Sequence, residues 1–404
     1  MAGKAATLPA GVRLADYLGT GLLARICTPD EVALALQATG RQSKRQRDLP
    51  AHAVAYYVMA LSLYRSVNYQ EVLRVVTEGM QMLGDHAIRR DVGKSGISAA
   101  RTRLGWQVMS HLAGRVLKPL ADARTHGAFF GRYRVVNLDG STLDVADEAA
   151  NVNAFGYPGT QQGRSGYPQL RFTALLENGT HVMFGVACGG YQESEMSLAH
   201  LSVSHLKPDM LCLADRGLSG FPLWQAAQAT DAQLLWRIPR NRQLPIVKRL
   251  DDGSYLSMIA PAPTTQKKMA GSTAPIQVRV IDYQLPGVPD AEPIYRVMTT
   301  LLDHKEASAV ALAKLFHERW VIETTLAELK TTLKGADIVL RSKTPDLVRQ
   351  EFYGLLLAHY AIRKLMWEAA LTRDEPPERL GFKQAVNTVR RKLPAYGAIS
   401  PRAV

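Results

Sequence analysis

Apolar residues recur at helical spacing through the first third of the chain. Four segments carry them at intervals of three and four, which is typical of amphipathic helices. These segments are LADYLGTGLLARI, TPDEVALALQATG, AHAVAYYVMALSLY and YQEVLRVVTEGMQML. Thr28 and Asp30 suit a helix start and Gly40 suits a helix end. The pattern therefore predicts an all-helical region from residue 13 to about residue 120.

A basic helix is expected at the end of this region, over residues 93–117. Ser95 or Ser98 suits its cap, which would place Arg101 and Arg103 in its first turns. Basic residues near a helix N-terminus suit contacts to DNA, so both arginines are candidate DNA-binding residues. An ordinary amphipathic helix is the alternative. A separate basic run holds Arg41, Lys44, Arg45 and Arg47, and it is interpreted either as a solvated loop or as a phosphate contact.

From about residue 130 the pattern changes to short apolar runs, which predict strands. The first run is YRVVNLDGSTLDV, and its apolar part ends at Asp139, directly before Gly140. QLRFTALLE and THVMFGVACGG are two further strands, joined by a turn at Asn178-Gly179. A short buried strand in DMLCLADRGLSG ends at Asp215. AQLLWRIPR is the next strand, and Arg237 and Arg240 near its end are candidate phosphate contacts.

Residues 241–306 alternate between apolar and polar positions as antiparallel strands do. The strand candidates here are PIVKRL, SYLSMIA, IQVRVIDYQL and PIYRVMTTLL. Two further helices are expected after residue 340, a long one from about Pro345 to Thr372 and a basic one around FKQAVNTVRRKL.

Residues 315–334, LFHERWVIETTLAELKTTLK, are predicted to form a helix with two different faces. Phe316, Arg319 and Lys330 all fall within roughly 40° of Glu323 at about 100° per residue. An apolar stripe adjoins this face and consists of Leu315, Ile322, Leu326, Leu329 and Leu333. The helix is therefore expected to hold one carboxylate between two cations, beside its core-facing side.

Two interpretations of this helix stay open. Glu323 and Arg319 are four residues apart, so they suit a surface ion pair. The other interpretation is an acidic metal ligand, Glu323, flanked by cations that bind phosphate, Arg319 and Lys330. Glu318 and Glu328 are expected to point away from both faces.

The spacing Arg319-x3-Glu323-x6-Lys330, with an aromatic residue three positions before the arginine, resembles the signature helix of the insertion-element-four group of DDE transposases. The signature begins with tyrosine, whereas this chain has Phe316, which leaves only ring packing or stacking at that position. LDGST around Asp139 and LADRG around Asp215 resemble the two aspartate motifs of the same group. The resemblance covers nearly the whole chain, including the helical region that precedes the aspartates.

The resemblance implies an RNase H-like α/β core with a β-rich insertion, in which Asp139, Asp215 and Glu323 are the catalytic residues and the metal ligands. Three carboxylates suit two Mg²⁺ ions, with Mn²⁺ as a substitute, in the two-metal arrangement. The implied activity is cleavage of DNA strands at terminal inverted repeats, followed by joining of the 3′ ends to target DNA. The implied partners are double-stranded DNA and a second copy of the chain in a homodimeric synaptic complex.

Other candidate groups are interpreted as structural. Asp144 follows Asp139 by one short strand and is an outer-shell candidate, while Glu193 and Glu195 suit the start of a helix, where negative charge is favoured. Trp236 and Trp320 are expected in the core rather than as stacking platforms. The histidines show no zinc-binding spacing.

Charge and composition agree with a DNA-binding protein. The 404 residues carry 49 Lys and Arg against 36 Asp and Glu, a net charge of +13, which favours a polyanionic partner. Three scattered cysteines predict neither a disulfide framework nor a zinc finger and fit a reducing cytoplasm. No signal peptide or apolar run of membrane-spanning length is found, so the bacterial cytoplasm, in association with the nucleoid, is the expected location.

The expected organisation has six parts. They are a flexible tail (1–12), a helical N-terminal DNA-binding domain (13–125), the first part of the core (126–240), the β-rich insertion (241–306), the rest of the core (307–372) and a C-terminal basic helix (373–404). Two alternatives to a transposase stay open. One is a transposase-derived DNA-binding protein without catalysis, and the other is a related metal-dependent DNA nuclease.

Overall fold

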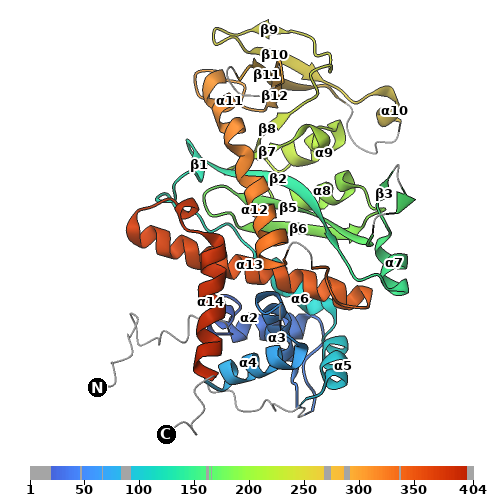
Figure 1. Ribbon diagram of the computed structural model, residues 1–404. Coiled ribbons are helices and arrows are strands. Elements are labelled where there is room, and N and C mark those ends of the chain that lie inside the picture. The colour runs from blue at the N-terminus through green and yellow to red at the C-terminus, as the bar shows by residue number, and fades with distance from the viewer. Residues whose placement is uncertain are drawn as a thin grey trace.

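The N-terminal third of the chain is helical, as its apolar spacing predicts. The computed structural model describes residues 20–45, 48–65, 67–82, 92–160, 163–164, 166–267, 274–285, 292–335 and 338–397. Its first helices are α1 (Thr20–Ile26), α2 (Pro29–Ala38), α3 (Ala51–Leu63), α4 (Tyr69–Met82), α5 (Lys94–Leu104) and α6 (Trp106–Val116). They form the layer at the bottom of Figure 1. The predicted tail, residues 1–12, lies outside the described residues.

The local end signals act as expected in α2. The Thr28 hydroxyl accepts a hydrogen bond from the backbone N–H of Glu31 at 3.3 Å, and Gly40 has the positive φ that ends a helix. The helix predicted over residues 93–117 is instead two helices. Gly105, at φ +74°, ends α5 and starts α6, because a residue with positive φ cannot continue an α-helix.

The core of the molecule is one mixed sheet. Its first strands are β1 (Phe129–Phe130), β2 (Tyr133–Asp144), β5 (Gln169–Glu177), β6 (Met183–Gly190), β7 (Met210–Ala214) and β8 (Gln233–Arg237). The strand order is β6-β5-β2-β7-β8, and β2, β7 and β8 are parallel. A small separate pair, β3 (Gly159–Thr160) and β4 (Gly163–Arg164), stands apart from it. This α/β arrangement after an all-helical region is the predicted fold class.

The four strands predicted in residues 241–306 are confirmed, and they join the same sheet. They are β9 (Lys248–Arg249), β10 (Tyr255–Ile259), β11 (Ile276–Tyr283) and β12 (Tyr295–Thr299), and the short helix α10 (Pro263–Gln266) lies among them. β12 pairs antiparallel with β8, so the sheet continues as β8-β12-β11-β10-β9. The insertion therefore extends the core sheet, as the top of Figure 1 shows.

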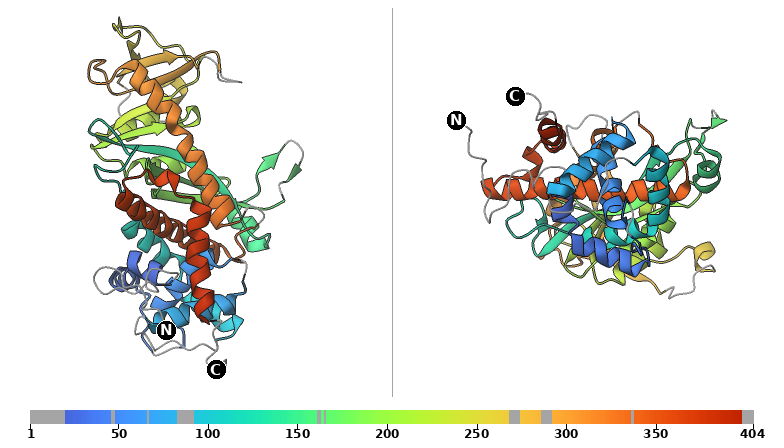
Figure 2. Two further views of the ribbon diagram at one scale, coloured as in Figure 1. Left: turned by 60° about the vertical axis from the view of Figure 1, so that its left-hand side comes forward. Right: turned by 90° about the horizontal axis from the view of Figure 1, so that it is seen from below.

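Helices cover both faces of the sheet. α8 (Glu195–Val203) and α9 (Phe221–Gln228) lie on one face, and α11 (Ala309–His317) with α12 (Val321–Ala327) crosses the other. Figure 2 shows this last pair running along the sheet from the insertion toward the helical layer. The remaining helices are α7 (Ala149–Phe155), α13 (Pro345–Arg373) and α14 (Phe382–Gly397).

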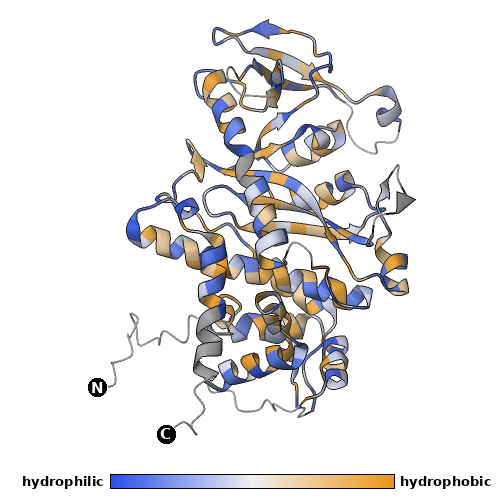
Figure 3. Ribbon diagram, in the orientation of Figure 1, coloured by the Kyte–Doolittle hydropathy of each residue, from blue (hydrophilic) through white to orange (hydrophobic). Residues whose placement is uncertain are grey.

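α13 joins the helical layer to the sheet. It packs on α3 and α6 from one side, while Phe352 of α13 meets Phe172 of β5 with ring centroids 5.3 Å apart. Buried apolar residues consequently form one continuous core from α1 through α13 into the sheet. Figure 3 shows the apolar colour concentrated in the central strands and in α13. A second, smaller core lies between the other face of the sheet and α11.

Candidate active site

The two candidate aspartates lie side by side on neighbouring parallel strands. Leu138 of β2 is paired in register with Ala214 of β7, so Asp139 and Asp215 are the next residues along the two strands. β7 ends at Ala214, as predicted. β2 does not end at Asp139, however, because its pairing with β5 continues from Asp139 to Asp144. The predicted strand end was therefore wrong for Asp139, although the pairing with β7 does stop there.

Strand alternation places both carboxylates on the face that α11 and α12 cover. Side chains of a strand alternate between the two faces. Val135 and Leu213 belong to the core beneath α11, and Asp139 and Asp215 continue the same alternation. Gly140 consequently faces the opposite side, where the Glu195 carboxylate of α8 lies against it. A Cβ on Gly140 would stand 2.3 Å from a Glu195 oxygen and 3.1 Å from the Phe172 carbonyl oxygen, so a larger residue here would have to displace the Glu195 side chain.

The environment of Asp139 disfavours its ionised form. The pKa of the carboxyl is raised from the ordinary 3.8 to about 6, chiefly by burial and also by the negative charges of Glu195 and Asp215. Two effects act in the opposite direction. The Gly140 N–H donates a hydrogen bond to Asp139 at 2.8 Å, and the positive charge of Arg319 lies nearby. Asp139 is thus an acid held at a site where a cation would be stabilised.

The predicted helix over residues 315–334 is one helical segment with two irregular turns. A 3₁₀ turn (Glu318–Trp320) separates α11 from α12, and a π-helical turn (Glu328–Leu333) follows α12. Phe316 is buried beneath the sheet, and the Arg319 guanidinium lies over its ring at 5.6 Å. The side chains of Trp320 and Ile322 lie outside the described residues.

The helical segment carries Glu323 between two contacts to the aspartate strands. Arg319 Nη2 lies 3.9 Å from Asp215 Oδ2, and Lys330 Nζ donates a hydrogen bond to Ser141 Oγ at 3.1 Å. Ser141 is on the same face of β2 as Asp139. Glu323 itself is exposed, and it makes no ion pair with any residue that the structure describes. Arg319 is therefore directed at Asp215 and not at Glu323.

Glu328, at the start of the π turn, is not directed as predicted. Regular helical spacing directs this residue away from the core, yet its carboxylate is largely buried and forms an ion pair with Arg363 of α13. Burial raises the pKa of Glu328, but His359 beside it and the positive charge of Arg363 outweigh burial and hold the pKa below its ordinary value. A π turn inserts an extra residue into the helix and rotates the residues around it. Glu328 thereby anchors the turn that carries Lys330.

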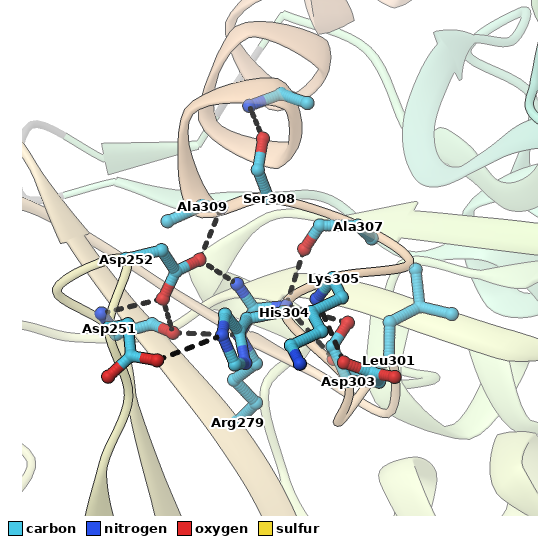
Figure 4. Close-up of polar contacts among 12 residues, drawn as sticks. Asp251, Asp252, Arg279, Leu301, Asp303, His304, Lys305, Ala307, Ser308 and Ala309 are labelled. Atoms are coloured by element: carbon cyan, nitrogen blue, oxygen red, sulfur yellow. Dashed lines mark hydrogen bonds and ion pairs between the residues drawn. The ribbon is translucent and has the colours of Figure 1, made fainter.

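The insertion fixes the other end of the same helical segment, as Figure 4 shows. Arg279 of β11 is fully buried and donates to the carbonyl oxygen of Ala307 at 2.6 Å. Its guanidinium also pairs with Asp252 at 2.5 Å, and Asp252 accepts a hydrogen bond from the N–H of Ala309, the first residue of α11. The N-terminus of a helix carries partial positive charge, which favours a carboxylate such as that of Asp252 at this position. The insertion thus determines where the helix with Glu323 begins.

Arg237 and Arg240 differ in their surroundings. The Arg237 guanidinium is largely buried, lies 2.7 Å from Glu292 and 3.8 Å from Asp215, and covers the Tyr295 ring. It is directed into the acidic site, so it contributes positive charge beside Asp215. Arg240 lies beyond the end of β8 and is exposed. Of the two, Arg240 is the one accessible to a DNA strand.

Arg101 is a structural residue, which corrects the prediction that it binds DNA. It lies in the last turn of α5 and is 4% exposed. Its guanidinium donates to Gln350 at 2.9 Å, to Ser342 at 3.0 Å and to the Leu347 carbonyl at 3.1 Å. These bonds join α5 to the start of α13, a contact that lies 241 residues or more away in the sequence. Arg103, two residues later, is exposed.

Several residues of the site escaped the sequence analysis. Ser141, Arg279 and Asp252 depend on contacts between distant segments, for which the local pattern gives no signal. For Ser141 the sequence gave a weak signal, because this residue follows Asp139 by two positions in a predicted strand and therefore shares its face. Asp144 accepts a hydrogen bond from Gln169 at 2.8 Å, as an outer group would. Trp236 is fully buried in the core, as expected.

The donor set suits a hard divalent cation. Asp139, Asp215 and Glu323 offer only carboxylate oxygens, which Mg²⁺ prefers. One oxygen of Asp215, Oδ1, is buried and accepts no hydrogen bond among the described residues, and the Arg237 guanidinium lies 3.8 Å from it. No group of three or more His, Cys, Asp or Glu side chains in the described ranges is already arranged around one point.

Two aspartates on adjacent strand positions beneath a helix with a glutamate between cations are the arrangement expected of a DDE-type site. A family model for the transposase DDE domain matches residues 130–361, and a model for the insertion element 4 transposase N-terminal region matches residues 18–113. The chain belongs to the insertion-element-four group of DDE transposases. Enzymes of this class cleave DNA and depend on divalent metal ions.

One curated relative is the transposase InsG for insertion sequence element IS4 of Escherichia coli (strain K12). It is 25% identical over 391 residues, which cover 96% of this chain and 84% of the relative. No helix in the described ranges combines the length and the apolar character that crossing a bilayer requires.

Proposed function

We propose that this chain is an active transposase that binds the terminal inverted repeats of an insertion sequence, cleaves the DNA strands and joins the 3′ ends to target DNA. The observation that carries the proposal is the register of β2 and β7. It sets Asp139 beside Asp215 on the face crossed by the helix with Glu323. An inactive descendant would have no need to retain all three acids in this relation.

Asp139, Asp215 and Glu323 would hold the divalent ions, two Mg²⁺ in the proposal, with Mn²⁺ as a substitute. Two such ions supply activation of the attacking water or 3′-hydroxyl and stabilisation of the leaving oxygen. Asp139, on the strand between β5 and β7, is proposed as the shared ligand. Asp215 and Glu323 would each complete one ion.

The cations of the helical segment are proposed to hold the DNA at these carboxylates. Lys330 bonds to Ser141, two residues from Asp139, so a phosphate that replaces this bond lies close to the proposed metals. Arg319 has a planar guanidinium that suits bidentate contact with a phosphate. When DNA binds, Arg319 would exchange its contact with Asp215 for a phosphate oxygen, which leaves Asp215 available as a ligand. Arg240 would contact the strand farther along.

We also propose that the protein acts on double-stranded DNA as a homodimer in a synaptic complex, in the bacterial cytoplasm and in association with the nucleoid. These proposals rest on the family relation and on the net charge of +13. The helical region would supply recognition of the repeat end.

The test is a strand-transfer assay with the full chain, Mg²⁺, a labelled duplex taken from the DNA that flanks the gene, and a target plasmid. We expect the wild type with Mg²⁺ to give nicked duplex and joined product. Neither product should form with Asp139→Asn, or with the wild type in EDTA. Asp139→Asn should still bind the duplex, because affinity rests largely on cations. Binding without cleavage by the wild type would favour the DNA-binding alternative. Cleavage without joining would favour the nuclease.

A further inference from the structure

A second basic site lies in the helical layer, far along the chain from the carboxylates. It is a hollow of about 230 Å³ between the α2–α3 connection and the end of α5. Its lining includes Arg41, Ser43, Lys44 and Arg103. No Asp or Glu is among the lining residues in the described part of the chain. The local charge of the hollow is therefore strongly positive.

Contacts from residues 40–43 hold the first part of the connection that carries these cations. Gly40 reverses the chain after α2 with a φ of +65°. Arg41 Nη1 donates to the carbonyl oxygen of Arg103 at 3.2 Å, and the Ser43 hydroxyl accepts from the N–H of Ala51, the first residue of α3, at 2.9 Å. The backbone is thus held against α3 and the Arg41 side chain against α5. Pre-organised donors bind an anion with less loss of side-chain freedom.

Arg41 and Lys44 keep most of their hydrogen-bonding capacity. A guanidinium has five N–H donors, and the Arg103 carbonyl is the single hydrogen-bond acceptor that Arg41 contacts among the described residues. Lys44 is exposed, and it makes no hydrogen bond or ion pair with any residue that the structure describes. Asp48, the nearest acid in the sequence, does not line the hollow. An oxyanion is the ligand that this donor set fits.

We propose that the hollow binds a backbone phosphate of the DNA duplex. The proposal deepens the proposed function and rests on it. A phosphate protrudes from the duplex and can enter a small concave site lined by cations, whereas a base edge is read by a side chain that reaches into a groove. The helices whose residues line the hollow, α3 and α5, lie on the opposite side of α13 from the sheet (Figure 1). The phosphate in the hollow is consequently distinct from the one that is cleaved.

The site also replaces the interpretation of α5 as a recognition helix. Arg101 of that helix is buried, while Arg103 faces the hollow together with residues of another connection. The helical layer thus offers a site that positions the duplex. A contact of this kind contributes to affinity for any sequence.

The test measures fluorescence anisotropy of labelled duplexes with the full chain between 50 and 300 mM salt, a range over which a phosphate contact changes affinity about severalfold. The variants are Lys44→Ala and Arg41→Gln. Lys94→Ala is the matched control, because Lys94 is an exposed cation at the opposite end of α5 and outside the hollow. Thermal unfolding of each variant verifies that it is folded.

We expect Lys44→Ala and Arg41→Gln each to lower affinity about fivefold and to lower the slope of log affinity against log salt by about one. The loss should be equal for terminal-repeat and scrambled duplexes, and Lys94→Ala should bind as the wild type does. Ethylation interference adds a positional readout, since one phosphate whose ethylation weakens the wild type should have no effect in Lys44→Ala. Wild-type affinity and slope in both hollow variants would overturn this proposal alone. Failure of the wild type to bind terminal-repeat DNA would overturn the proposed function as well.

Discussion

Replacing Asp139 by asparagine should stabilise the metal-free protein, and only above a defined pH. Folding raises the pKa of this carboxyl from 3.8 to about 6, chiefly through burial. The folded state therefore holds the proton more tightly than the unfolded state does. Its stability falls as the pH rises from about 4 to about 6, and the loss is complete above the folded pKa. Asparagine has nearly the same shape and carries no charge, so it avoids this loss.

The magnitude follows from the shift. A difference of about two pKa units corresponds to about 3 kcal/mol at 1.36 kcal/mol per unit. This is an upper limit, since the carboxyl is partly accessible and water screens its charge. Asp139→Asn should accordingly unfold with a free energy higher by up to about 3 kcal/mol at pH 8 and by almost nothing at pH 4. Stability would thus be given up at this position to keep a charge that the reaction needs.

The assay is urea unfolding in EDTA at several pH values, followed by the same series with Mg²⁺. Mg²⁺ should stabilise the wild type at pH 8, by about 2.7 kcal/mol at a hundred times its dissociation constant, and should leave Asp139→Asn nearly unchanged. Asp144→Asn, on the same strand, is the matched control substitution. An equal difference between Asp139→Asn and wild type at pH 4 and pH 8 would refute the reasoning.

Three further substitutions test other parts of the structure. Lys330→Ala removes one hydrogen bond to Ser141, so it should lower the unfolding free energy by no more than about 1.5 kcal/mol. It should nevertheless lower the slope of log DNA affinity against log salt by about one. A large loss of stability with normal DNA affinity would show that Lys330 only supports the helix. Arg101→Met should lower the unfolding free energy by about 3 kcal/mol, because Gln350, Ser342 and the Leu347 carbonyl lose their donor. A stable variant with weakened DNA binding would contradict the structural role of Arg101. Gly140→Ala should lower the unfolding free energy by about 1–3 kcal/mol through overpacking against Glu195. Adding Glu195→Ala should recover part of this stability, as measured by thermal unfolding. If no stability is recovered, another contact requires the glycine.

The sequence by itself determined the local elements and the identity of the chemistry. Apolar periodicity is a property of one segment, so it placed α2, α3, β5 and β7 correctly, and it placed Asp215 at a strand end. The order of two aspartates and one glutamate, with Arg319 and Lys330 at fixed spacing, was sufficient to indicate the family. These features depend on residues that are close in sequence or that occur in a set order.

The tertiary structure alone decided what depends on partners distant in sequence. β2 continues past Asp139 because β5 pairs with it, and Arg101 is buried because residues of α13 accept its hydrogen bonds. Glu328 is largely buried because Arg363 of α13 compensates its charge. Hydrogen bonding and charge pairing between distant segments outweigh the local pattern at these positions, because a buried polar group must find its partner wherever the fold supplies one.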